Sequence, residues 1–175
     1  YVEVEDIQGL GRAIHGHPMI SGFVSSGIFA FKNMAPWCSL LATLPSLERV
    51  QFGLQGQRDL VDVEPLKELL RMPALRFVRF DDFCFTNELC HATADVLEEG
   101  STMIDITFGY GCSFPDGGRA IIANALKRNA SVIDATFLGD CDEPFCDTLG
   151  SVLLYNSTLQ DLTLQLPEEN ASGRW

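Results

Sequence analysis

The sequence predicts an α/β fold in which similar strand–helix units stack side by side into a curved solenoid. Three observations support this prediction. A short apolar pattern recurs at a nearly even interval, a stretch with helical periodicity follows most copies, and Gly, Asn or Pro residues separate one unit from the next. A single unit of this kind cannot bury its own apolar face, whereas stacked units share one continuous core.

The recurring pattern starts near residues 19, 47, 75, 103, 132 and 159, so the intervals are 28, 28, 28, 29 and 27 residues. From the second copy onward the fourth and sixth positions are apolar and alternate with other residue types, which is the period of a β-strand. The first copy is irregular, because a start at 19 puts Gly22 in a core position and Phe23 on the outward side. The sixth positions are expected to form one buried row on adjacent parallel strands: Phe80, Phe108, Phe137 and Leu164.

Segments with helical periodicity follow the strands, and residues that favour helix ends bound them. The apolar residues of 119–129, for example, fall on one helical face. Pro65 and Pro144 suit first helical turns, and Thr86 is a predicted N-cap. The predicted helical segments are 65–70, 92–99, 119–129 and 145–156. The residues predicted to close helices in the left-handed conformation are Gly100, Asn129 and Asn156.

The spacing of the two kinds of element predicts the shape of the stack. Parallel strands lie about 4.8 Å apart, whereas packed helices need about 8–10 Å. The sheet is therefore expected on the concave side and the helices on the convex side. The repeated L-x-x-L-x-L frame and the stretch "ALKRNASVIDATF" resemble the ribonuclease-inhibitor-like class of leucine-rich repeats over about residues 19–164. The resemblance implies a binding surface, and it does not imply one particular partner.

The repeats are predicted to occupy residues 19–166. Residues 1–18 look like the helical half of an earlier, truncated unit, and residues 167–175 look like a tail. The first residue is not Met, so we expect the chain to be an excerpt of a longer array.

Composition narrows the class of partner and the compartment. The chain has 175 residues, with 12 basic and 24 acidic ones, for a formal charge of −12. Such a surface repels phosphate backbones, which argues against nucleic acid, and favours basic partners. No apolar run is long enough for a membrane span, so no membrane association is expected. Six cysteines without a C-x-x-C pair favour reduced thiols and a cytoplasmic location, with Cys84, Cys112 and Cys141 free and little exposed.

The outward positions of the predicted strands carry the candidate binding residues. Third positions bring three aspartates into one row, and fifth positions bring three threonines into the next. An arginine- and phenylalanine-containing patch on the earlier strands has the residue types of binding hot spots. The alternative is a solvated face inherited by repeat duplication. The predicted partner-binding residues are Arg49, Phe77, Arg79, Asp105, Thr107, Asp134, Thr136, Asp161 and Thr163.

No arrangement of residues in the sequence indicates catalysis, a cofactor or a metal. The glycine-rich stretch 109–118 lacks the Lys of a phosphate-binding loop, and His15 and His17 have no partner ligands nearby in sequence. The sequence therefore predicts a protein–protein interaction module that is not an enzyme. The alternative function is a GTPase-regulating or enzyme-associated surface, in which an arginine such as Arg79 reaches into a partner's active site.

Overall fold

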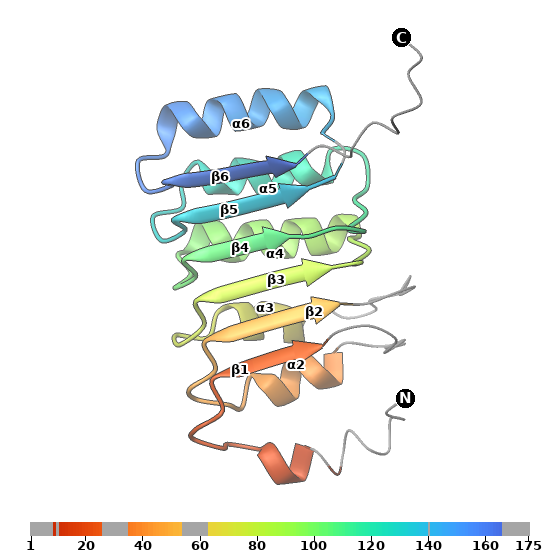
Figure 1. Cartoon of the computed structure of the whole chain (residues 1–175), viewed down its shortest axis with the longest axis vertical. Coiled ribbons are helices and arrows are strands. Elements are labelled where there is room, and N and C mark those ends of the chain that lie inside the picture. The colour runs from red at the N-terminus through yellow and green to blue at the C-terminus, as the bar shows by residue number, and fades with distance from the viewer. Residues whose placement is uncertain (1–8, 10, 26–34, 54–62, 140, 166–175) are drawn as a thin grey trace.

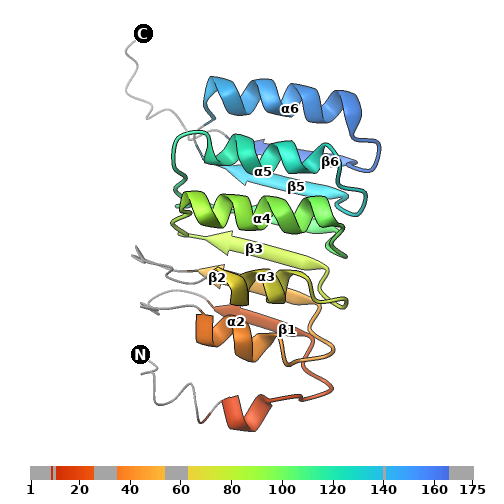
Figure 2. The ribbon, with the colours of Figure 1, turned by 180° about the vertical axis from the view of Figure 1, so that it is seen from behind.

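A computed structural model describes residues 9, 11–25, 35–53, 63–139 and 141–165. Six parallel strands form one open sheet in the order β1 to β6, and helices alternate with them along the chain (Figure 1). The helices form a second layer on one side of the sheet (Figure 2). The strands are β1 Gly22–Ser25, β2 Arg49–Gly53, β3 Phe77–Asp81, β4 Asp105–Phe108, β5 Asp134–Leu138 and β6 Asp161–Gln165. The helices are α2 Ala35–Leu41, α3 Glu64–Leu70, α4 Asn87–Glu99, α5 Gly118–Leu126 and α6 Glu143–Tyr155.

The α/β class and the stacking of repeated strand–helix units are confirmed, as is the strand register from the second unit onward. Each fourth position pairs with the next, from Val50 to Val78, Ile106, Ala135 and Leu162. The sixth positions pair in the same way, from Phe52 to Phe80, Phe108, Phe137 and Leu164. The apolar alternation within a strand therefore predicted which side of each strand faces the helices.

The register expected for the first unit is wrong by one residue. Gly22 pairs with Arg49 and Phe23 with Val50, so the unit starts at residue 20. Phe23 then lies on the core side, where its ring centroid is 5.6 Å from that of Trp37. A shift of one residue exchanges the two faces of a strand, and the burial of an aromatic ring decides which register is adopted.

A row of phenylalanine rings runs through the core between the sheet and the helices. Ring centroids are 5.9 Å apart between Phe52 and Phe80, 5.8 Å between Phe80 and Phe108, and 5.0 Å between Phe108 and Phe137. The prediction for Leu164 is wrong, because its side chain is 43% exposed. Leu164 lies on β6, the last strand of the sheet, and no later element of the described chain packs over it.

Most of the predicted helix boundaries are confirmed, and two are not. Thr86 caps α4, since its side-chain oxygen accepts a hydrogen bond from the Leu89 amide, and Gly100 closes the same helix at φ 96°. Pro65 and Pro144 lie in first turns. Asn129 and Asn156 do not adopt the left-handed conformation; α5 already ends at Leu126, and Asn156 is extended.

The side chains of Asn129 and Asn156 instead connect neighbouring units. The Nδ2 group of Asn129 donates to the Leu97 carbonyl at 2.8 Å, and its Oδ1 accepts from the Val132 amide at 2.6 Å. Asn156 repeats this pattern one unit later: its Nδ2 donates to the Leu126 carbonyl, and its Oδ1 accepts from the Leu159 amide at 2.7 Å. Each amide therefore holds the end of a preceding helix against the start of the next strand.

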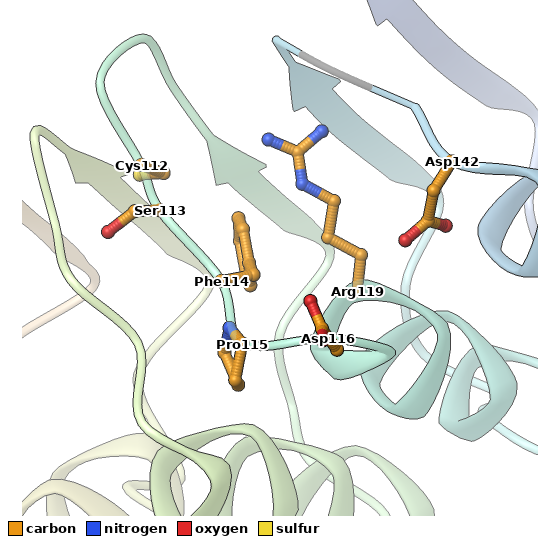
Figure 3. Close-up of a pocket in the computed structure, with 7 residues that line it drawn as sticks. All are labelled: Cys112, Ser113, Phe114, Pro115, Asp116, Arg119 and Asp142. Carbon is orange, nitrogen blue, oxygen red and sulfur yellow. The ribbon is translucent and has the colours of Figure 1, made fainter.

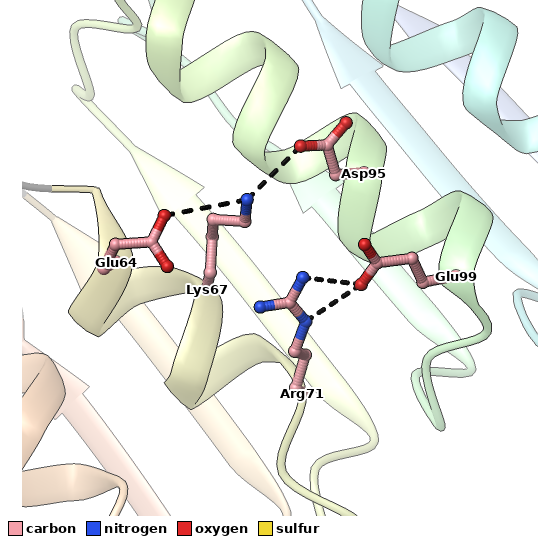
Figure 4. Close-up of polar contacts among 5 residues, drawn as sticks. All are labelled: Glu64, Lys67, Arg71, Asp95 and Glu99. Carbon is pink, nitrogen blue, oxygen red and sulfur yellow. Dashed lines mark hydrogen bonds and ion pairs between the residues drawn. The ribbon is translucent and has the colours of Figure 1, made fainter.

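Charged side chains also connect α3 and α4 on the helix layer (Figure 4). Lys67 lies 3.7 Å from Glu64 and 3.3 Å from Asp95, and the Arg71 Nε group donates to Glu99 at 3.0 Å. The Lys67 side chain is only 17% exposed, but every pair has an exposed carboxylate, so each is expected to add at most about 1 kcal/mol to stability. They are structural contacts between successive units.

All six cysteines are free, and one of the predicted exposures is wrong. Cys112 is buried, which raises the pKa of its thiol to about 11, and Cys141 is half-buried. Cys84 is exposed. It lies between Phe83 and Phe85, whose rings both enter the core with centroids 4.8 Å apart, so the intervening side chain points the other way.

Two of the predicted segments of the chain, one at each end, lie partly or wholly outside the residues that the structure describes. Of residues 1–18, the structure describes residue 9 and residues 11–18, with a helical turn at 11–14. The predicted tail at 167–175 lies outside the described residues. Within the described ranges, no helix has the length and apolar character needed to cross a membrane.

Candidate binding surface on the open sheet face

The strand register brings all of the predicted site residues onto the side of the sheet that faces away from the helices, called here the sheet face. Figure 1 views the sheet from this side. Together with Gln51, these residues form two rows across the strands. The first row runs through Arg49, Phe77, Asp105, Asp134 and Asp161, and the second through Gln51, Arg79, Thr107, Thr136 and Thr163. The side chains are half-buried or exposed, as expected for a face that is open to a partner.

The part of the sheet face over β2, β3 and β4 is a shallow pocket of about 280 Å³. At its β2 side the Arg49 guanidinium carbon lies 4.8 Å from the centre of the Phe77 ring. This distance is typical of a cation–π contact, which holds the arginine over the ring. The pocket is lined by Arg49, Val50, Gln51, Phe77, Val78, Arg79, Asp105 and Thr107.

Arg79 is held in the sheet face by a carboxylate on its own strand. Its Nε and Nη2 groups donate to the two oxygens of Asp81 at 2.7 and 2.9 Å, and Gln51 also donates to Asp81 at 3.0 Å. The hydrogen bonds to Asp81 raise the pKa of Arg79, and the charges of Asp81 and Asp105 act in the same direction. The site reasoning missed Gln51 and Asp81. Gln51 lies two residues after Arg49 on β2, and Asp81 lies two residues after Arg79 on β3. The strand period places residues i and i+2 on the same side, so the sequence could have indicated that both face outward.

The part of the sheet face over β4, β5 and β6 is acidic. Asp105, Asp134 and Asp161 lie directly opposite one another on neighbouring strands, and Thr107 donates to Asp105 at 3.2 Å. Partial burial raises the pKa of Asp134, and the neighbouring carboxylates of Asp161 and Asp105 raise it further. The sheet face therefore has a positive and aromatic end at β2 and a negative end at β6.

Glycine is required at position 109, where the backbone after β4 passes close to Asp81. A Cβ atom at this position would lie 1.8 Å from the Asp81 Oδ1 atom and 3.0 Å from the Phe80 carbonyl oxygen. The Gly109 amide also donates to that carbonyl at 2.7 Å. The absence of a side chain at Gly109 thus leaves the space in which Asp81 receives Arg79.

Gly109→Ala is expected to displace Asp81 and to separate it from Arg79, because a carboxylate can move more easily than the backbone. The measurement is the NMR signal of the Arg79 side-chain Nε–H, which should shift and broaden. Gly150→Ala is the matched control, since position 150 lies in α6 with no atom within 4 Å of an added Cβ. The control should leave that signal unchanged and stabilise the protein by about 0.5–1 kcal/mol. An unchanged Arg79 signal in Gly109→Ala would contradict the close approach.

A second pocket, of about 300 Å³, lies beyond the carboxyl ends of β4 and β5 (Figure 3). Arg119 is the central residue and is only 8% exposed. It donates to the Leu138 carbonyl at 3.3 Å, and its guanidinium carbon lies 4.8 Å from the centre of the Phe114 ring. From the sequence, 109–118 was considered only as a possible phosphate-binding loop, and this pocket, which forms only when successive loops lie together, was not predicted.

Potential metal ligands are dispersed in the described parts of the chain. No group of three His, Cys, Asp or Glu side chains there could hold a metal ion. His15 and His17 are both exposed, and His17 Nδ1 accepts a hydrogen bond from the Met19 amide at 3.3 Å.

Compared with the models of known protein families and with curated protein sequences, the chain matches none of them.

Proposed function

We propose that the chain is a leucine-rich-repeat module of the ribonuclease-inhibitor-like type that binds another protein through its sheet face. The observation that carries the proposal is the pair of side-chain rows across the sheet face, one through Arg49 and Phe77 and the other through Gln51 and Arg79. These rows place cationic, aromatic, hydroxyl and acidic groups on adjacent strands without a covering helix. Arginine and aromatic residues dominate the energetics of many protein interfaces, which supports the β2–β3 end as an anchor.

The acidic end supports a partner with a basic surface. Three carboxylates at neighbouring-strand spacing repel one another, and a basic partner relieves this repulsion. The free thiols support a reducing compartment such as the cytoplasm.

The alternative, an arginine that enters a partner's active site, has less support. Arg79 donates its Nε and Nη2 groups to the two oxygens of Asp81. Extension of Arg79 away from the face would have to break this bidentate pair, at a cost in free energy. The Arg79–Asp81 pair is better suited to positioning a partner than to stabilising charge in a transferred phosphate.

Replacing Asp105, Asp134 and Asp161 together with Asn tests the proposal. Proteins retained by the immobilised wild-type chain are compared with those retained by the triple variant, and a retained protein is then titrated at low and physiological salt. We expect weaker binding to the variant and a smaller salt dependence, because fewer exposed charges remain to be screened. The matched control is Glu68→Gln, Glu98→Gln and Asp147→Asn. It removes the same charge from exposed positions on the helices and should bind as the wild type does.

The same triple variant is expected to be as stable as the wild type or slightly more stable at neutral pH. The raised pKa of Asp134 means that the folded state favours the protonated carboxyl. Its stabilising contribution is therefore present below the unfolded-state pKa, about 3.9, and is lost as pH rises through the folded-state value. The stability difference between variant and wild type, measured by urea unfolding, should thus grow from pH 3 to pH 7. A marked loss of stability in the variant would mean that the aspartates are required by the fold.

A further inference from the structure

The sheet face also indicates the charge pattern of its partner. Resting on the proposed function, we propose that Arg49 and Phe77 form a binding site for one carboxylate of an extended, otherwise basic partner segment. That segment carries a basic side chain about four residues from the acidic one.

Arg49 is the available cation of the pocket. Arg79 already donates to Asp81, whereas Arg49 is exposed and no carboxylate of the described chain forms an ion pair with it. Its recorded contact is with the face of the Phe77 ring, at 4.8 Å. Stacking uses the flat face of a guanidinium and leaves N–H donors at its edge, where they can bind both oxygens of a carboxylate. Ring contact also restricts the side chain before the partner arrives, which lowers the entropy cost of binding.

Phe77 keeps the positive and negative ends of the face separate. In the first row it pairs with Arg49 on one side and with Asp105 on the other. Phe77 thus lies between Arg49 and Asp105 in this row, and the described residues show no ion pair between these two side chains. The charge on Arg49 thus stays available to an incoming carboxylate.

The acidic row sets the orientation of the partner. A second carboxylate over β4 to β6 would meet Asp105, Asp134 and Asp161 and would be repelled, whereas a basic side chain would be attracted. The acidic side chain of the partner must therefore lie at the β2 end. This polarity goes beyond a general preference for basic partners, because it requires one acidic residue at a defined place.

The strand spacing sets the distance between the two charges of the partner. The Arg49 guanidinium lies over the Phe77 ring on β3, and from this strand to Asp161 on β6 there are three strand spacings, about 14 Å. An extended chain covers about 3.4 Å per residue, so four residues span this distance and leave both side chains on the same side. A helical segment would need about nine residues to cover the same distance, at about 1.5 Å per residue. A spacing of four residues therefore identifies an extended segment that crosses the strands.

A library of displayed peptides, random at every position, tests the inference against the immobilised chain. We expect enrichment of peptides with one acidic and one basic residue four positions apart, in either sequence order. Individual enriched peptides are then titrated against the wild type, Arg49→Ala and Arg49→Glu. Loss of a carboxylate–guanidinium contact should weaken binding about tenfold or more in Arg49→Ala. Arg49→Glu should bind best those peptides whose acidic residue has been replaced by Lys.

The matched control is Arg128→Ala, which removes an exposed arginine just after α5 and should leave peptide binding unchanged. One outcome would overturn the carboxylate site. In it, the enriched peptides are purely basic, bind Arg49→Ala as well as the wild type, and no longer bind the Asp105, Asp134 and Asp161 triple variant. This outcome would leave the proposed function intact. Peptides insensitive to both sets of substitutions, or no enriched peptide at all, would count against the proposed function and this inference together.

Discussion

Phe108→Ala is expected to destabilise the protein by about 3–5 kcal/mol, the largest effect among these substitutions. The Phe108 ring lies at the centre of the aromatic row and is 1% exposed. Its centroid lies within 5.0–5.8 Å of the ring centroids of Phe80, Phe137, Phe85 and Phe114. Truncation removes apolar area from the core and leaves a cavity between units that contact each other through this ring.

The measurement is urea unfolding of wild type and variant, with the midpoint and the slope both recorded. Tyr110→Ala is the control, because Tyr110 is an aromatic residue two positions later whose side chain is 53% exposed. Its loss should change stability by less than about 0.5 kcal/mol. A loss below about 1 kcal/mol for Phe108→Ala would show that this ring does not belong to a packed core.

Asn129→Ala is expected to cost roughly 2–4 kcal/mol, because it leaves polar backbone groups without partners. Asn129 is 4% exposed, and its amide binds the Leu97 carbonyl of one unit and the Val132 amide of the next. A methyl group can replace neither contact. Since the asparagine connects two units, its loss should also weaken the cooperativity with which they unfold.

Hydrogen exchange and urea unfolding measure the effect of Asn129→Ala. Protection should fall first at the Val132 amide, which loses its acceptor. Asn124→Ala is the control, since Asn124 is an exposed residue on α5, the helix that ends just before Asn129, and alanine favours helix there. It should leave stability equal or slightly higher. Equal stability of Asn129→Ala and Asn124→Ala would mean that water replaces the contacts of the buried amide.

The strand–helix repeat and the sheet face from β2 to β6 follow from the sequence alone. Val78 and Phe80 alternate with Phe77 and Arg79, and each later strand repeats this alternation. The period of apolar residues is local, and burial of these residues against the helices is the dominant favourable free energy of folding. The rows of aspartate and threonine could therefore be predicted residue by residue, and so could the aromatic row as far as Phe137.

Other features depend on groups about one repeat away, and only the tertiary structure decides them. Trp37 and Phe52 draw Phe23 into the core against the regular spacing. Leu164 is partly exposed because no later element of the described chain packs over it. Gln51 joins Arg79 at Asp81, and Asn129 reaches Leu97, because stacking brings these groups within hydrogen-bonding distance. Sequence periodicity predicts which side of a strand is apolar. The polar partner of a side chain depends on three-dimensional distances between units, which periodicity does not contain.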